Sequence, residues 1–68
     1  MPLNEQKKQG VIFEFTQWGN CIKVVAVDTI TGLEVTIMGP KTASQAYLER
    51  IALTKLRYAL NKQRSSDG

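Results

Sequence analysis

Alternating apolar and polar residues predict paired β-strands in the first half of the chain. Residues 11–18 and 21–27 both follow the period of two that is typical of a strand with one buried face. Gly19-Asn20 lies between them and predicts a two-residue type II′ turn, because glycine at the first central position tolerates positive φ. This hairpin pairs Trp18 with Cys21.

The next connection ends in Gly32 and allows two registers for a third strand. A four-residue loop pairs Asp28 with Leu33, whereas a three-residue loop with a bulge pairs Val27 with Val35 and turns the strand over. A slip of one residue exchanges the two faces of a strand. We favour the four-residue loop because it gathers the large apolar side chains on one face: Phe13, Phe15, Ile22, Val24, Ala26, Leu33, Val35 and Ile37.

A long helix follows the sheet. Gly39-Pro40 ends the third strand, since proline has no N–H for the ladder. Thr42 then predicts an N-cap, with Gln45 three residues later completing a capping box, and the helix runs to about Lys62. The predicted fold class is α+β, a three-stranded antiparallel β-meander packed against one long C-terminal α-helix (β-β-β-α).

The domain organisation is simple. Residues 1–9 form a flexible polar leader, residues 10–63 a single domain, and residues 64–68 a disordered polar tail.

This unit carries more apolar surface than one sheet and one helix can cover. Leu48, Ala52, Leu56 and Ala59 form the central helical stripe that faces the sheet. Apolar residues also occupy both flanks of that stripe and the sheet face turned away from the helix. A contiguous exposed apolar patch marks an interface, so we expect a non-enzymatic interaction module that forms a homodimer. The interface candidates are Ile12, Trp18, Val25, Val27, Met38, Tyr47, Ile51, Tyr58, Leu53 and Leu60, and the sequence does not decide which face is used.

Charge supplies an alternative function. The net charge is +3, and the helical segment is basic whereas the strands are acidic. Arg50, Arg57 and Arg64 recur every seven residues and form a basic ridge that could follow a phosphate backbone. The alternatives are therefore a small nucleic-acid-binding protein, or an accessory subunit that docks onto a larger protein partner.

Candidate chemistry is sparse. The chain has no histidine and one cysteine, Cys21, which removes histidine-based catalytic and metal sites and any internal disulfide. Glu14 and Glu34 lie on an open face without a cleft, and Gly39-Pro40-Lys41 lacks P-loop spacing. We expect no enzymatic activity, no cofactor, no metal and no small-molecule substrate. The polar start and the short apolar runs predict neither a signal peptide nor a membrane span, which favours the cytoplasm.

Several short motifs together resemble a family of small uncharacterised bacterial proteins, mainly alphaproteobacterial. They are Gly19-Asn20, Val24, Ala26, Asp28, Thr31-Gly32, Glu34-Val35, Gly39-Pro40, Leu48-Glu49-Arg50, Ala52-Leu53, Lys55-Leu56 and Tyr58. The resemblance covers residues 11–62 and implies a bacterial cytosolic protein of unknown function. The family has no established activity, so no functional residues are carried over from it.

Overall fold

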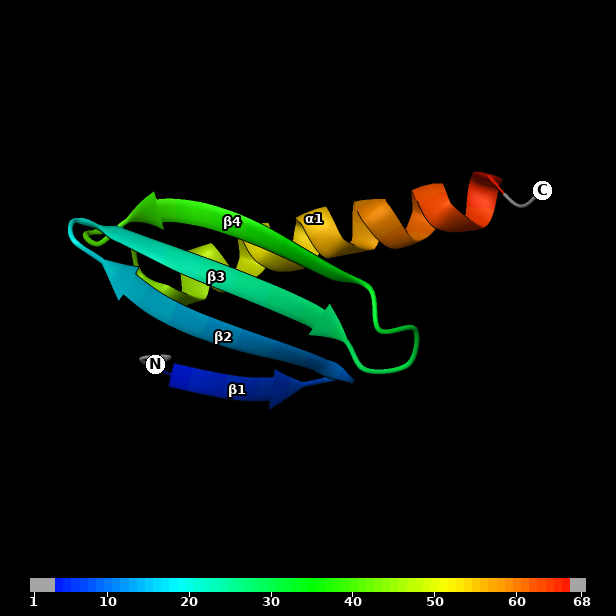
Figure 1. Cartoon of the computed structure of the whole chain (residues 1–68), viewed down its shortest axis with the longest axis horizontal. Coiled ribbons are helices and arrows are strands. Elements are labelled where there is room, and N and C mark those ends of the chain that lie inside the picture. Colours follow the sequence, from blue (N-terminus) through cyan, green and yellow to red (C-terminus); the bar gives the residue numbers. More distant parts are fainter. Residues whose placement is uncertain (1–3, 67–68) are drawn as a thin grey trace.

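Within residues 4–66, four antiparallel strands form one sheet, and a long helix crosses one of its faces (Figure 1). The computed structural model describes residues 4–66, and the side chains of residues 5–63. The strands lie in chain order and each pairs with the next. The elements are β1 (Asn4–Lys8), β2 (Val11–Trp18), β3 (Cys21–Asp28), β4 (Glu34–Pro40) and α1 (Gln45–Ser66).

The predicted hairpin between β2 and β3 is confirmed. Trp18 pairs with Cys21 across the turn, and Phe15 lies opposite Val24. Gly19 has a φ of 61°, while Asn20 keeps a negative φ. Positive φ at the first central position alone is the conformation of a type II′ turn.

The favoured register of the strand after Gly32 is also confirmed. Val27 pairs with Glu34, and the N–H of Asp28 donates to the carbonyl of Leu33 at 2.8 Å. The carboxylate of Asp28 stabilises the loop by hydrogen bonds to Thr31. It accepts hydrogen bonds from the backbone N–H and the hydroxyl of Thr31, both at 2.8 Å. This local bonding closes the four-residue loop without a bulge, and the alternative register is wrong.

The three-stranded sheet is corrected to four strands, because residues 4–8 of the predicted polar leader form β1. Gln9 and Gly10 have φ values of 53° and 79°, so they make a two-residue type I′ turn that folds β1 back along β2. The sequence of β1 has no alternating apolar residues, and its backbone pairing with β2 holds it in the sheet. Residues 1–3 lie outside the described part of the chain.

The helix begins later and ends later than predicted. Ser44, rather than Thr42, is the N-cap: its hydroxyl accepts a hydrogen bond from the N–H of Tyr47 at 3.1 Å. The carbonyl of Ser44 also accepts the first helical bond, from Leu48. Because α1 continues to Ser66, residues 64–66 are helical rather than part of a disordered tail, and residues 67–68 are not described.

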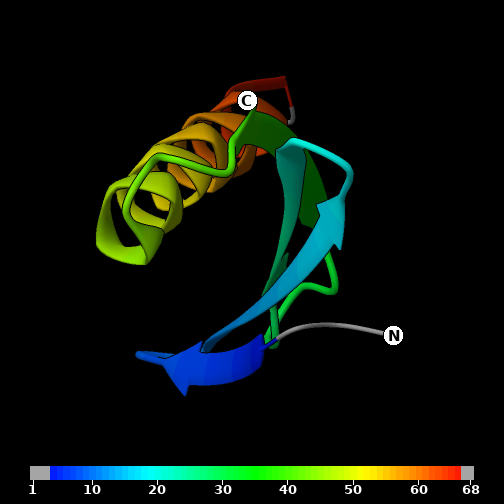
Figure 2. The same ribbon diagram turned by 90° about the vertical axis from the view of Figure 1, so that its left-hand side faces the viewer.

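The sheet curves around the helix, so the core lies on its concave side (Figure 2). The absence of a side chain at Gly39 lets α1 pack closely on β4, because a Cβ at this position would collide with Leu48 Cδ2. The helix packs mainly on β3 and β4. The buried core consists of Val11, Phe13, Phe15, Val24, Ala26, Leu48, Ala52 and Leu56. This confirms three of the four residues of the predicted central helical stripe as fully buried, and Ala59 is half-buried.

Candidate interaction surface

One flank of α1 exposes large apolar side chains. Tyr47, Ile51 and Tyr58 expose 50%, 37% and 67% of their surface. They lie within about 40° of one another around the helix, since each residue advances the helix by about 100°. We call these three residues the open flank.

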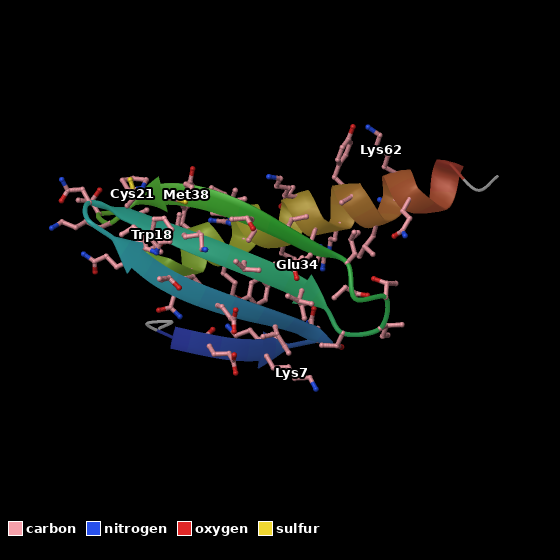
Figure 3. All side chains as sticks on the ribbon, viewed as in Figure 1. Lys7, Trp18, Cys21, Glu34, Met38 and Lys62 are labelled. Atoms are coloured by element: carbon pink, nitrogen blue, oxygen red, sulfur yellow. The ribbon has the colours of Figure 1, made fainter. Side chains whose placement is uncertain are left out.

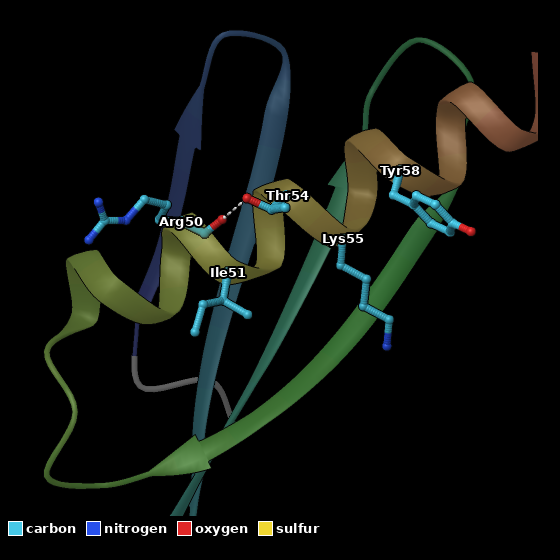
Figure 4. Close-up of a pocket in the computed structure, with 5 residues that line it drawn as sticks. All are labelled: Arg50, Ile51, Thr54, Lys55 and Tyr58. Carbon is cyan, nitrogen blue, oxygen red and sulfur yellow. Dashed lines mark hydrogen bonds between the residues drawn. The ribbon is translucent and has the colours of Figure 1, made fainter.

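The open flank borders an open groove (Figure 4). Arg50, Ile51, Thr54, Lys55 and Tyr58 line this groove. The side chain of Lys55 extends from the helix to β4, where its ammonium donates a hydrogen bond of 2.8 Å to the backbone carbonyl of Thr36. The open flank therefore lies beside β4, which is an edge strand of the sheet formed by residues 4–66.

Along its outer edge, β4 presents backbone N–H and C=O groups that do not bond to β3. In an antiparallel pair, residues that bond to the neighbouring strand alternate with residues whose N–H and C=O point away from it. The bond between Asp28 and Leu33, together with that from the N–H of Lys41 to the carbonyl of Asn20, fixes this alternation. The outward-pointing residues of β4 are Glu34, Thr36, Met38 and Pro40. We call their backbone groups the free edge of β4.

The opposite flank of the helix is partly covered. Leu53 and Leu60 are half-buried and pack against the core. Glu49 on the same side forms an ion pair with Lys8 of β1, with 3.2 Å between Oε1 of Glu49 and Nζ of Lys8. This flank is therefore covered in part, and the open flank is the more exposed of the two apolar flanks.

The outer sheet face, which points away from the helix, carries the remaining interface candidates (Figure 3). Trp18 and Met38 are 61% and 54% exposed. The ammonium of Lys23 lies 4.9 Å from the centroid of the Trp18 ring, close enough for a cation–π contact. The other three candidates on this face are half-buried: Ile12, Val25 and Val27.

Carboxylates interrupt the outer sheet face. Glu5 of β1 lies directly opposite Glu14 of β2. A hydrogen bond with Glu5 raises the pKa of Glu14, partial burial and the charge of Glu5 raise it further, and Lys23 opposes the shift. Cys21 of β3 lies opposite Trp18, is exposed, and is a free thiol. This face is a mixed polar surface rather than a continuous apolar one.

The predicted arginine ridge is only partly within the described side chains. Arg50 and Arg57 are exposed on the helix surface turned from the sheet, and Arg50 also lines the groove. Arg64 lies on the last turns of α1, and its side chain is outside the described residues. Sequence reasoning did not single out Ile30, which is 89% exposed in the loop between β3 and β4. Its position in the predicted loop after Asp28-Thr29 could have indicated this exposure, because loop residues lie at the surface.

Within residues 4–66, the structure brings no three potential metal-ligating side chains together. In the same part of the chain, α1 is not apolar enough to cross a membrane. The fold and the surface define a small α+β domain with one apolar helix flank beside an unpaired sheet edge. The chain belongs to a family described as a domain of unknown function (DUF6898), which matches residues 8–63. No curated protein and no solved structure matches it.

Proposed function

We propose that this protein is a non-enzymatic interaction module that self-associates as a homodimer through the open flank. The observation that carries the proposal is the exposure of Tyr47, Ile51 and Tyr58 along one side of a helix whose other side is packed. Exposed tyrosines and isoleucines in a contiguous patch are typical of association surfaces. Two copies can bury this patch against each other by twofold symmetry.

The outer sheet face is less suited to this role. Its convex shape limits the area over which two copies could touch (Figure 2). Association would also remove Glu5, Glu14 and Lys23 from water, and burial of imperfectly paired charges costs free energy. The open flank adjoins a concave groove and requires less charge burial.

The available area is consistent with a dimer of ordinary size. Taking about 200 Å² for each fully exposed large side chain, the open flank exposes about 300 Å² per copy. A stable interface buries about 800 Å² per partner. The groove and the free edge of β4 adjoin the flank and can supply the remainder. The flank therefore forms the centre of the interface and the edge its extension.

Light scattering or sedimentation equilibrium at micromolar concentration tests the proposal. We expect a mass about twice that of one chain. The double variant Ile51→Ser/Tyr58→Ser should give the mass of one chain with an unchanged far-UV circular dichroism spectrum, because neither side chain belongs to the buried core. Trp18→Ser is the matched control on the outer sheet face and should remain dimeric. A wild-type protein that stays monomeric at these concentrations would overturn the proposal.

Nucleic-acid binding is the competing function. The two functions should differ in how their binding affinity changes with salt concentration. Binding to phosphates through Arg50 and Arg57 weakens steeply as salt rises, because counterions are released. Dimerisation through the open flank brings basic groups such as Lys55 of both copies together, so salt should strengthen it by screening their repulsion. Duplex DNA that binds at low salt and is lost in Arg50→Gln/Arg57→Gln would favour the competing function. Co-purification of a larger protein with the intact chain would favour the accessory-subunit alternative.

A further inference from the structure

We infer that two copies join by antiparallel pairing of β4 with the partner's β4, which makes one continuous eight-stranded sheet. This inference rests on the proposed homodimer and names its geometry. An edge strand with outward N–H and C=O groups is a template for another strand. The hydrogen bond from Lys55 to the carbonyl of Thr36 places the free edge of β4 next to the side of α1 that carries the open flank, so a strand added there would lie under that flank.

The two edges of the sheet differ in a way that favours β4. The outer positions of β1 that point away from β2 belong to Glu5 and Lys7, both charged and exposed. Charged residues on a short edge strand discourage pairing. The corresponding positions of β4 are Glu34, Thr36, Met38 and Pro40, of which only Glu34 is charged, and the strand is seven residues long. The β4 edge also has the apolar helix flank beside it, which the β1 edge lacks.

Proline selects the register of the pairing. Pro40 has no N–H, so it cannot complete the ladder at that end of the free edge. Three residues can both donate and accept: Glu34, Thr36 and Met38. Only a pairing centred on Thr36 uses all three in both copies, with Thr36 opposite the partner's Thr36 and Glu34 opposite the partner's Met38. The twofold axis then passes through this central pair.

The positions of the helices agree with such an axis. The helix packs on β3 and β4 to a similar extent, which places its axis above the space between them. Neighbouring strands are about 4.8 Å apart, so a twofold axis at the β4 edge would separate the two helix axes by about 10 Å. Packed helices lie about 8–10 Å apart. The open flanks of the two helices would thus meet at ordinary packing distance, with Ile51 and Tyr58 between them.

The hydrogen bond of Lys55 does not block this arrangement. A carbonyl oxygen has two lone pairs, so the oxygen of Thr36 can accept from Lys55 and from the N–H of the partner's Thr36. The two ammonium groups would lie on the concave side near the axis. Their mutual repulsion is the unfavourable element of this interface, so Lys55→Met should tighten the dimer.

Proline substitution on the free edge tests the inference. Thr36→Pro removes an N–H that points away from β3, so a single chain should keep its fold. In the dimer the same change removes two symmetry-related ladder bonds and inserts two rings, and should raise the dissociation constant at least about 30-fold. Lys7→Pro is the matched control, because its N–H points away from β2 on the opposite edge. It should leave the dissociation constant unchanged.

Hydrogen exchange keeps the test decisive if Thr36→Pro fails to fold. In the wild-type protein, the amides of Thr36 and Met38 should exchange more slowly as the protein concentration rises, while the amide of Lys7 should not respond. A wild-type dimer with fast-exchanging Thr36 and Met38 amides, or one that tolerates Thr36→Pro, would overturn β4 pairing and leave the homodimer standing. A monomeric wild-type chain would overturn both.

Discussion

Gly39→Ala should destabilise the protein, because the first turns of α1 pack against the backbone of β4 at this residue. A Cβ at position 39 would collide with Leu48 Cδ2, and Leu48 is only 2% exposed. Relieving the collision requires movement within a packed core, and overpacking of this kind costs about 1–3 kcal/mol. The total stability of a 68-residue domain is about 3–10 kcal/mol. The loss is therefore a large fraction of the total, and urea unfolding at fixed protein concentration will measure it.

A double-mutant cycle separates this collision from a general effect of alanine in a strand. Leu48→Val removes the Cδ2 atom and should by itself cost about 1–2 kcal/mol, the transfer of a methylene plus a small cavity. In the double variant the new methyl group occupies part of the vacated space, so the two losses should sum to more than the measured loss. Strictly additive losses, or a Gly39→Ala variant as stable as the wild type, would refute the close approach of α1 to β4.

Two predictions concern the pH dependence of stability. Hydrogen bonds from the backbone N–H and then the hydroxyl of Thr31 lower the pKa of Asp28 below its ordinary 3.8. The stability that the Asp28 carboxylate contributes is therefore present above pH 3.8 and is lost as the pH falls through the lower pKa of the folded state. Asp28→Asn should therefore be less stable than the wild type at neutral pH, with the difference vanishing in acid; a constant difference would contradict this. Glu5 raises the pKa of Glu14 above its ordinary 4.5. The stability that protonated Glu14 contributes is therefore present below pH 4.5 and is lost as the pH rises through the higher pKa of the folded state. Glu5→Gln should raise the urea midpoint at neutral pH more than at pH 4, and an equal or opposite change would contradict the carboxylate pairing.

The parts of the fold that the sequence predicted correctly depend on local signals. The turn at Gly19-Asn20 determines the β2–β3 register, since a two-residue loop allows only one pairing. The β3–β4 register needed a second criterion, the burial of Leu33, Val35 and Ile37 on the face of the phenylalanines, and all three pack against the core. Turn geometry and face assignment agreed there, which is why the choice between two loops succeeded.

The strand β1 and the N-cap of α1 were predicted wrongly for different physical reasons. In β1 the stabilising contacts are backbone bonds to β2, which leave no apolar period in the sequence. The turn at Gln9-Gly10 was the available signal, although glutamine is uncommon at a position with positive φ. At the helix start, Thr42 and Ser44 are both good caps by residue type. The hydroxyl of Ser44 is the one that bonds to Tyr47, and tertiary packing of Leu48 decides between them.

The candidate site was predictable as a set of residues but not as a place. Helical periodicity identified both apolar flanks of α1 correctly. It could not tell which flank the sheet covers, because that depends on where the helix sits across the strands. The structure divides the candidates: Leu53 and Leu60 pack on the core, whereas Tyr47, Ile51 and Tyr58 remain exposed.

The strand β1, which the sequence analysis missed, explains why one helix flank is partly covered and the other is exposed. On the concave face, Gln6 of β1 lies beside Phe13, and Lys8 reaches α1 through its ion pair with Glu49. The β1–β2 hairpin curves toward the side of the sheet on which the helix lies (Figure 2), and Leu53 of the helix packs against the core. The helix does not need to lie centrally over the sheet to cover the phenylalanines, so it packs on β3 and β4 and its other flank stays exposed. A fourth strand on one side and an uncovered helix flank on the other are thus two consequences of one packing arrangement. In a twofold dimer, the partner's β4 and helix would cover the open flank as the β1–β2 hairpin covers the opposite one.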